Sequence, residues 1–161
     1  MAIAVGGLLL ASTAAAAEAD GDVFGEQAVK IERVLRQARE GGSVSQTRLG
    51  WLIADLLADL SARDPALSAF FHRDGRFIET YLINVFQHQA AHEVAAVEAM
   101  AAEGRRNLRL AARSALEALR HIPDDADPPA NQEQDRREMI EALTELDGLL
   151  RNLAAAPDAD N

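Results

Sequence analysis

Hydrophobic residues recur at steps of three and four along most of the chain, the spacing that places side chains on one face of an α-helix. In the segment 23–40 the apolar positions are Phe24, Ala28, Ile31, Leu35 and Ala38. In the segment 45–62 a wider stripe consists of Leu49, Leu52, Ile53, Leu56, Leu57 and Leu60. Each stripe needs a partner surface that removes it from water, so the pattern predicts helices packed against one another.

Glycine, proline and capping residues mark where the first helices begin and end. Asp22 is the expected N-cap of the first helix, and the pair Gly41-Gly42 is expected to stop it. The second helix is followed at once by Asp64-Pro65, a pair typical of an N-cap and a first helical position. A short third helix is therefore predicted to start there and to end near 74–75.

Three more helices are expected in the second half of the chain, over about 76–102, 105–121 and 132–153. Gly104 separates the first two, and the acidic, proline-containing segment 124–130 is the expected linker before the last. Asn131 is the predicted N-cap of that last helix. Its apolar seam is formed by Ile140, Leu143, Leu146, Leu150 and Leu153.

These elements predict the fold class. No segment shows the sustained alternation of apolar and polar residues that indicates β-strands. The chain has 161 residues, which fits one domain. We therefore expect an all-α fold, an antiparallel bundle of four to six helices that follows an N-terminal hydrophobic leader.

The N-terminal segment has the composition of an export signal. Residues 1–17 carry no charged side chain and end in Ala15-Ala16-Ala17, which supplies an A-x-A cleavage context, although a basic n-region is missing. The pattern predicts a signal peptide over 1–17, a helical bundle domain over 18–153 and a disordered acidic tail over 154–161. The expected location is periplasmic or secreted. A buried N-terminal helix and a retained membrane anchor are the alternatives.

Charge and cysteine content restrict the chemistry. The formal net charge is −10, and an acidic domain repels nucleic acid, so no nucleic-acid partner is expected. The absence of cysteine excludes disulfides, thiolate nucleophiles and cysteine-based zinc or iron–sulfur sites. Contact with a membrane is expected only through the leader, if it is not cleaved.

Two histidines form the sharpest candidate for a site. His88 and His92 are four residues apart, so both imidazoles lie on one face of the predicted helix 76–102. This spacing is typical of metal chelation, and His72 could join them if helices three and four fold back on each other. The zincin motif HExxH is absent because Gln89 follows His88. The alternative is that both are ordinary surface or core histidines, so no firm cofactor is predicted beyond a possible divalent transition metal.

Aromatic and charged residues are unevenly distributed. Six of the seven aromatic residues are expected to meet in one cluster: Trp51, Phe70, Phe71, Phe77, Tyr81 and Phe86. Arginines dominate the helix 105–121, and acidic residues dominate the helix 132–153. We expect these two helices to lie antiparallel with their charges paired across the seam. A basic face for an acidic protein or for anionic lipid is the alternative.

The sequence favours a binding role over catalysis. It contains no G-x-S-x-G, no P-loop and no G-x-G-x-x-G, and its acids are spread over solvent-facing positions. The leading hypothesis is an exported non-catalytic helical bundle that acts by binding an unknown protein partner or by homo-oligomerisation. The alternative is a periplasmic protein that binds or senses a divalent transition metal through His88 and His92. An enzyme of unknown class is the remaining alternative.

Overall fold

The computed structural model describes residues 23–72 and 86–155, and within these ranges the chain forms six helices and no strand. This confirms the prediction of an all-helical fold, whereas the predicted leader and tail end lie outside the described residues. The helices are residues 23–39, α2 (Gln46–Arg63), α3 (Pro65–Phe71), α5 (Phe86–Ala101), α6 (Arg106–Arg120) and α7 (Pro129–Ala155). None of these described helices combines the length and the hydropathy that a membrane crossing requires.

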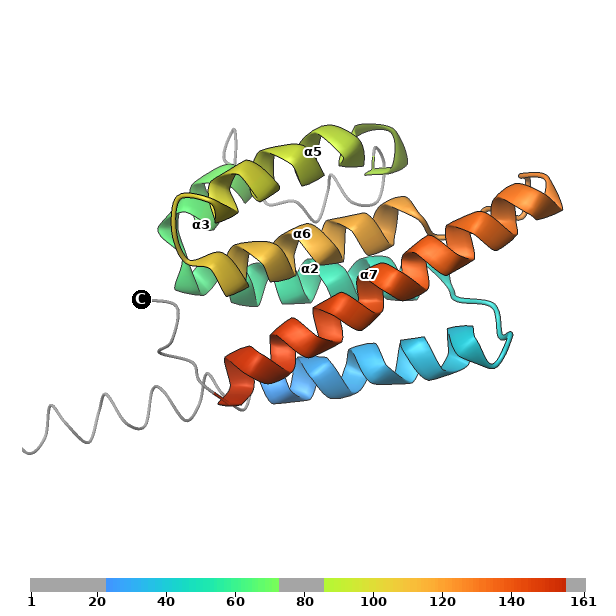
Figure 1. Cartoon of the computed structure of the whole chain (residues 1–161), viewed down its shortest axis with the longest axis horizontal. Helices are drawn as coiled ribbons and strands as arrows, with labels where there is room; N and C mark the ends of the chain where they lie inside the picture. The colour runs from blue at the N-terminus through green and yellow to red at the C-terminus, as the bar shows by residue number, and fades with distance from the viewer. Residues whose placement is uncertain (1–22, 73–85, 156–161) are drawn as a thin grey trace, which may run out of the picture.

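Helix α6 lies at the centre of the bundle. It packs against α5, α7 and α2, and Figure 1 shows it between α5 and α7. Small side chains permit this close approach on several sides, since Ala111, Ala112, Ala115 and Ala118 are all fully buried. Leu116, Leu143 and Leu57 fill the spaces between the helices from α6, α7 and α2.

Helix 23–39 is held against α7 by polar contacts as well as by its apolar face. All five residues of the predicted face are buried, from Phe24 to Ala38. Both Nε and Nη2 of Arg136 donate to the Ala38 carbonyl, and Arg151 Nη2 donates to Glu32 Oε2 over 3.0 Å. The two helices lie side by side at the lower edge of Figure 1. The seam between them therefore joins the first described helix to the last.

Local sequence signals determine three helix ends, of which the glycine stop after helix 23–39 and the Asp64 cap of α3 were predicted. After helix 23–39, the Gly42 N–H donates to the Gln37 carbonyl and Gly41 adopts a φ of +86°, the arrangement of a glycine C-cap. Ser45 Oγ caps α2 by accepting from the Arg48 N–H at 3.3 Å. Asp64 Oδ1 caps α3 by accepting from the Ala66 N–H at 3.0 Å. These ends are short-range features, which is why the sequence reveals them.

The start of α7 differs from the prediction. The helix begins at Pro129 rather than near 132, and Asn131 lies inside its first turn instead of capping it. The Asn131 N–H donates to the Pro128 carbonyl, so the chain is already turning three residues earlier. Proline at position 129 suits a first helical position because its missing N–H would have no partner there. On the apolar seam, Met139 is buried whereas Ile140 is only partly buried.

The predicted aromatic cluster is wrong for Trp51. Its side chain is 48% exposed, on the side of α2 opposite the buried Leu49 and Ile53. Phe70 and Phe71 do meet, edge to face, with ring centroids 5.0 Å apart. The side chains of Phe77, Tyr81 and Phe86 lie outside the described residues. A position two residues from each of two buried neighbours points away from the core of a helix, and this periodicity outweighs aromatic clustering.

The predicted charge seam between α6 and α7 exists in part. Arg113 Nη1 contacts Glu145 Oε2 at 3.2 Å across the two helices. Arg109, in contrast, turns to the junction of α2 and α3, where its Nε donates to Asp64 Oδ2 over 2.6 Å. This pair is shielded from solvent, with 12% of the Arg109 side chain and 1% of the Asp64 side chain exposed. The prediction was therefore wrong for Arg109, because a buried carboxylate at a helix junction is a stronger partner than the exposed acids of α7.

Candidate functional site

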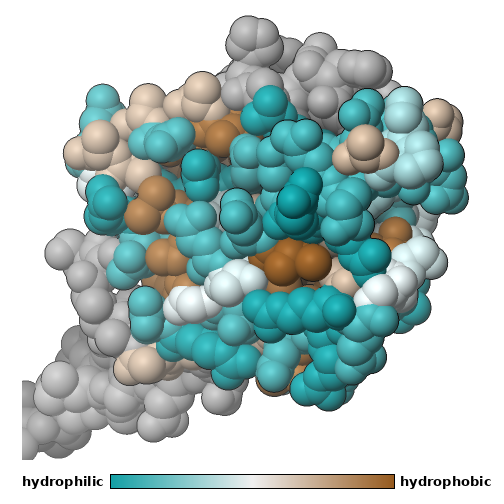
Figure 2. Space-filling model, turned by 45° about the vertical axis from the view of Figure 1, so that its right-hand side comes forward, coloured by the Kyte–Doolittle hydropathy of each residue, from teal (hydrophilic) through white to brown (hydrophobic). Residues whose placement is uncertain are grey.

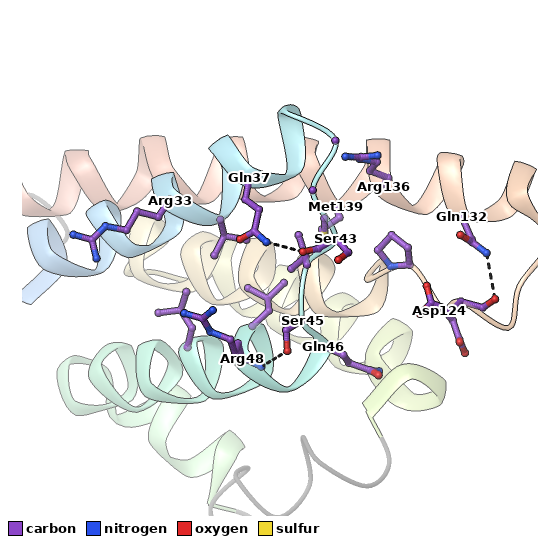
Figure 3. Close-up of a pocket in the computed structure, with 18 of the residues that line it drawn as sticks. Arg33, Gln37, Ser43, Ser45, Gln46, Arg48, Asp124, Gln132, Arg136 and Met139 are labelled. Atoms are coloured by element: carbon purple, nitrogen blue, oxygen red, sulfur yellow. Dashed lines mark hydrogen bonds between the residues drawn. The ribbon is translucent and has the colours of Figure 1, made fainter.

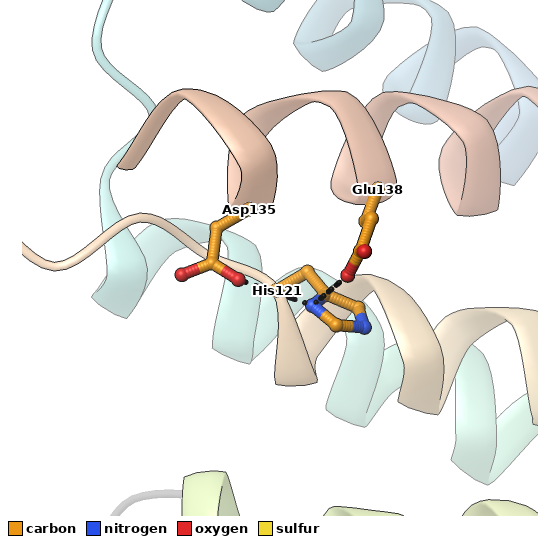
Figure 4. Close-up of side chains that lie close together, drawn as sticks. All are labelled: His121, Asp135 and Glu138. Atoms are coloured by element: carbon orange, nitrogen blue, oxygen red, sulfur yellow. Dashed lines mark hydrogen bonds and ion pairs between the residues drawn. The ribbon is translucent and has the colours of Figure 1, made fainter. Parts of the chain in front are cut away.

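The most chemically distinctive group of side chains gathers where α6 ends and α7 begins. His121 is the C-cap residue of α6, and its backbone N–H donates to the carbonyls of the preceding turn. Asp135 and Glu138 lie three residues apart on α7, so both carboxylates emerge from one face of that helix. Figure 4 shows the imidazole of His121 between these two carboxylates. Residues from two helices therefore converge on one point.

The turn between the helices brings these residues together. Asp124 Oδ1 accepts from the Ala126 N–H over 2.9 Å, and the Asp127 N–H donates to the Asp124 carbonyl. Gln132 Nε2 then donates to the Asp127 carbonyl over 2.7 Å, which joins the first turn of α7 to the linker. Ile122 is buried and anchors the start of the turn. The linker thus reverses the chain and sets the first turns of α7 beside His121.

Both ring nitrogens of His121 contact carboxylates. Nδ1 lies 2.8 Å from Glu138 Oε2 and 3.2 Å from Asp135 Oδ1. On the other side of the ring, Nε2 lies 3.0 Å from Glu117 Oε1, one turn earlier on α6. A carboxylate only accepts hydrogen bonds, so both nitrogens must donate for these contacts to be hydrogen bonds, as in the protonated ring. The imidazole is therefore surrounded by three acidic side chains.

The same geometry suits a metal ion in place of the Nδ1 proton. Nδ1 and one oxygen each of Asp135 and Glu138 lie within 4.8 Å of one another. Metal–ligand bonds of about 2.1 Å in an octahedral site place neighbouring donors about 3.0 Å apart, close to the two distances measured from Nδ1. Loss of the Nδ1 proton would free that nitrogen to ligate while Nε2–H still donates to Glu117. A carboxylate that fixes the ring of a ligating histidine is the usual support around metal sites.

Burial of the cluster is intermediate. The His121 side chain is 13% exposed, whereas those of Asp135 and Glu138 are 29% and 39% exposed. The imidazole is thereby held in place by its surroundings, and the carboxylates stay open to solvent. An ion can reach them without rearrangement of the bundle.

The histidines predicted from the sequence belong to other parts of the chain than this cluster. His88 and His92 belong to α5, but their side chains lie outside the described residues, so the predicted metal site there stays a prediction. His72 follows α3, and its Nδ1 lies 2.8 Å from the Ser68 carbonyl. From the sequence, His121 was predicted only as the end of a helix. The sequence feature that indicates this cluster is Glu117 one turn before His121, together with two acids three residues apart early in the next helix.

The buried pair at the other end of α6 has perturbed ionisation. Burial acts to raise the pKa of the Asp64 carboxyl, but the hydrogen bonds from Arg109 and the Ala66 N–H, with the charges of Arg109 and Arg105, lower it overall. The hydrogen bond to Asp64 raises the pKa of Arg109. Arg109 Nη1 also donates to the Met100 carbonyl, and Arg105 donates to the Arg63 carbonyl. Because both oxygens of Asp64 and all three nitrogens of the Arg109 guanidinium have partners, this pair serves the fold rather than a ligand.

The chain was compared with protein-family models, with curated proteins and with solved structures. None of the three comparisons found a match. Function is therefore argued from the site alone.

Proposed function

We propose that this chain is a non-catalytic helical-bundle protein that binds a divalent transition-metal ion through His121, Asp135 and Glu138. The observation that carries the proposal is the convergence of one imidazole nitrogen and two carboxylates at ligand spacing, with Glu117 behind the ring. The proposal keeps the metal-binding alternative drawn from the sequence and assigns it to a different histidine. Partner binding and homo-oligomerisation are compatible with such a site and stay predictions.

The donor set favours a particular class of ion. One imidazole nitrogen with carboxylate oxygens suits Zn²⁺, Mn²⁺, Co²⁺, Ni²⁺ or Fe²⁺, whereas Mg²⁺ and Ca²⁺ prefer oxygen donors alone. Three protein donors leave the remaining positions to water. Because the donors come from two helices, an ion would join the end of α6 to the start of α7. Binding only to the folded chain would then raise its stability with ion concentration.

Calorimetric titration of the chelator-treated full chain with Zn²⁺, Mn²⁺ and Ni²⁺ tests the proposal. His121→Gln and Glu138→Gln should each weaken binding at least tenfold, because each removes one donor. Glu117→Ala leaves all three donors in place and should still weaken binding about tenfold, since support residues of this kind typically contribute that much. The matched controls are His72→Ala and Glu141→Gln, which remove a histidine and an exposed α7 acid outside the cluster.

Two results would overturn the assignment. Equal heats for the wild type and His121→Gln would exclude His121 as a ligand. Loss of binding in the double variant His88→Ala/His92→Ala, with His121→Gln unaffected, would move the metal to the pair predicted from the sequence. Far-UV circular dichroism of each variant establishes that the bundle is still folded.

A further inference from the structure

A groove lies beside the α6–α7 turn and is lined by residues other than those of the histidine cluster. It has a volume of about 820 Å³ and is bordered by helix 23–39, the loop 41–45, the start of α2 and the first turns of α7. Figure 3 looks into it. Volumes of this size are typical of sites that hold a small organic molecule. The groove is independent of the proposed metal site and shares no residue with it.

The floor of the groove is formed by three partly buried hydrophobic residues that pack against the core, Val34, Val44 and Leu52. Leu49 and Met139 lie beneath them and are almost fully buried. Figure 2 shows apolar surface lying in hollows between polar rims on this side of the molecule. Apolar surface that remains open to water at the bottom of a hollow gains free energy when an apolar group covers it.

One end of the groove is cationic. Lys30 and Arg33 line it from helix 23–39, and Arg48 lines it from the first turn of α2. All three side chains are exposed, and within the described part of the chain none of them makes an ion pair. The chain has 26 acidic and 16 basic residues, so acidic partners are not scarce. Three cationic side chains that make no such ion pair favour an anionic group in this part of the groove.

The start of α2 strengthens this preference for an anionic group. Its first turn contains no acidic residue and carries Arg48, although a helix N-terminus favours negative charge. Repulsion between Arg48 and the N-terminal end of the helix dipole is relieved when an anion sits beside it. The opposite end of the groove carries three carboxylates, those of Asp124, Asp125 and Glu133, together with Arg136, whose guanidinium is hydrogen-bonded to the Ala38 carbonyl. Figure 3 shows Arg33 and Arg48 at one end and Asp124 at the other.

We propose that the groove binds a single-chain anionic amphiphile, such as a fatty-acid carboxylate. The carboxylate lies between Arg33 and Arg48, and the hydrocarbon chain covers Val34, Val44 and Leu52. Guanidinium groups suit this head group because they pair with a carboxylate through two parallel hydrogen bonds. A small inorganic anion would leave the apolar floor uncovered, and the carboxylates at the far end disfavour a second anionic group.

The single tryptophan provides the readout. Trp51 is the only tryptophan in the chain, it is 48% exposed, and it neighbours Leu52 and follows Arg48 by three residues on α2. Its fluorescence is followed while the full chain, with chelator present so that no metal contributes, is titrated with dodecanoate below its micelle concentration. Dodecyl maltoside is the uncharged amphiphile, and acetate is the head group without a chain. We expect a saturable change with dodecanoate that neither of the others produces at equal concentration.

Variants separate the contributions of head group and floor. The double variant Arg33→Gln/Arg48→Gln should bind dodecanoate at least tenfold more weakly, and Leu52→Gln should also weaken binding. Arg106→Gln/Arg137→Gln removes two exposed cations outside the groove and should bind as the wild type does. Equal affinity for dodecyl maltoside, an unchanged affinity in Arg33→Gln/Arg48→Gln, or binding only to anionic vesicles with none to monomeric dodecanoate would each overturn the proposal.

Discussion

The Asp64 carboxylate connects three helices, and its removal should lower the free energy of unfolding by about 3–4 kcal/mol. One oxygen caps α3 through the Ala66 N–H, and both oxygens accept from Arg109 on α6. Arg109 in turn donates to the Met100 carbonyl near the end of α5. The perturbation is Asp64→Ala, which removes the cap and leaves the guanidinium without its anion.

The magnitude follows from two losses. An N-cap replaced by alanine costs about 1 kcal/mol. Leaving a charge unpaired in a largely buried position costs about 3–5 kcal/mol when burial is complete, and we take about 2–3 kcal/mol because 12% of the Arg109 side chain is exposed. Chemical denaturation followed by circular dichroism measures the sum. A loss of this size corresponds to a fall in melting temperature of roughly 10 °C for a chain of this length.

Two further variants divide the effect between cap and ion pair. Asp64→Asn keeps a good N-cap but removes the charge, so it should recover only about 1 kcal/mol relative to alanine. Arg109→Met removes the cation and keeps most of the side-chain volume. In a double-mutant cycle of Asp64→Ala with Arg109→Met, the coupling energy should exceed about 1.5 kcal/mol. A coupling energy near zero would refute the view that the pair acts as one unit.

The same pair has a pH signature. The folded-state pKa of Asp64 is lowered, so its contribution is fully present above the ordinary aspartate pKa and is lost as the pH falls from there through the lowered value. The stability difference between wild type and Asp64→Asn should therefore be constant near neutral pH and shrink below about pH 4. A difference that is instead unchanged down to pH 2 would contradict the assigned direction of the shift.

Two other predictions follow from single features of the backbone and of the proposed site. Gly104→Ala should destabilise the chain by about 1–2 kcal/mol because the φ of +152° at position 104 is unfavourable for any L side chain. Gly148→Ala should stabilise it by about 0.5–1 kcal/mol because position 148 lies in a helix with open space around it. Denaturation midpoints of the two variants that shift in the same direction would contradict this. Saturating Zn²⁺ should slow amide exchange at the end of α6 and in the first turns of α7 but not at the α2–α3 junction, as measured by hydrogen-exchange mass spectrometry; uniform protection would indicate that the ion binds elsewhere.

The sequence predicts the helices of this fold well because their signals are local. Gly41, Ser45 and Asp64 act within one turn of their own positions, and the apolar stripes follow the helical period. The error at Trp51 arose from weighing aromatic composition above that period. Position 51 lies two residues from both Leu49 and Ile53, so the spacing alone places it on the outer side of α2.

The candidate site was harder to predict because its residues meet only in three dimensions. Asp64 and Arg109 are 45 residues apart, and the sequence identified the carboxylate as a cap without indicating its cation. His121 and Glu138 are joined by a turn whose geometry depends on the early start of α7 at Pro129. If α7 began near 132 with Asn131 as its cap, as predicted, the turn would be longer and would place Asp135 and Glu138 differently relative to His121. Which side chains pair with those of α6 therefore depends on how the helices pack against one another.

Both ends of α6 are held by charged groups, and the two ends differ in a way that bears on function. At its start, Arg105 donates to the Arg63 carbonyl, and all three guanidinium nitrogens of Arg109 donate to Asp64 or to the Met100 carbonyl. At its end, the imidazole of His121 faces more carboxylates than its protons require, and two of those carboxylates remain open to solvent. The middle of the helix is alanine-rich and closely packed, so neither end can move without the other helices. A surplus of acceptors on a fixed element is a preorganised cation site. The structural clamp thus lies at one end of α6, and the proposed ion site lies at the other.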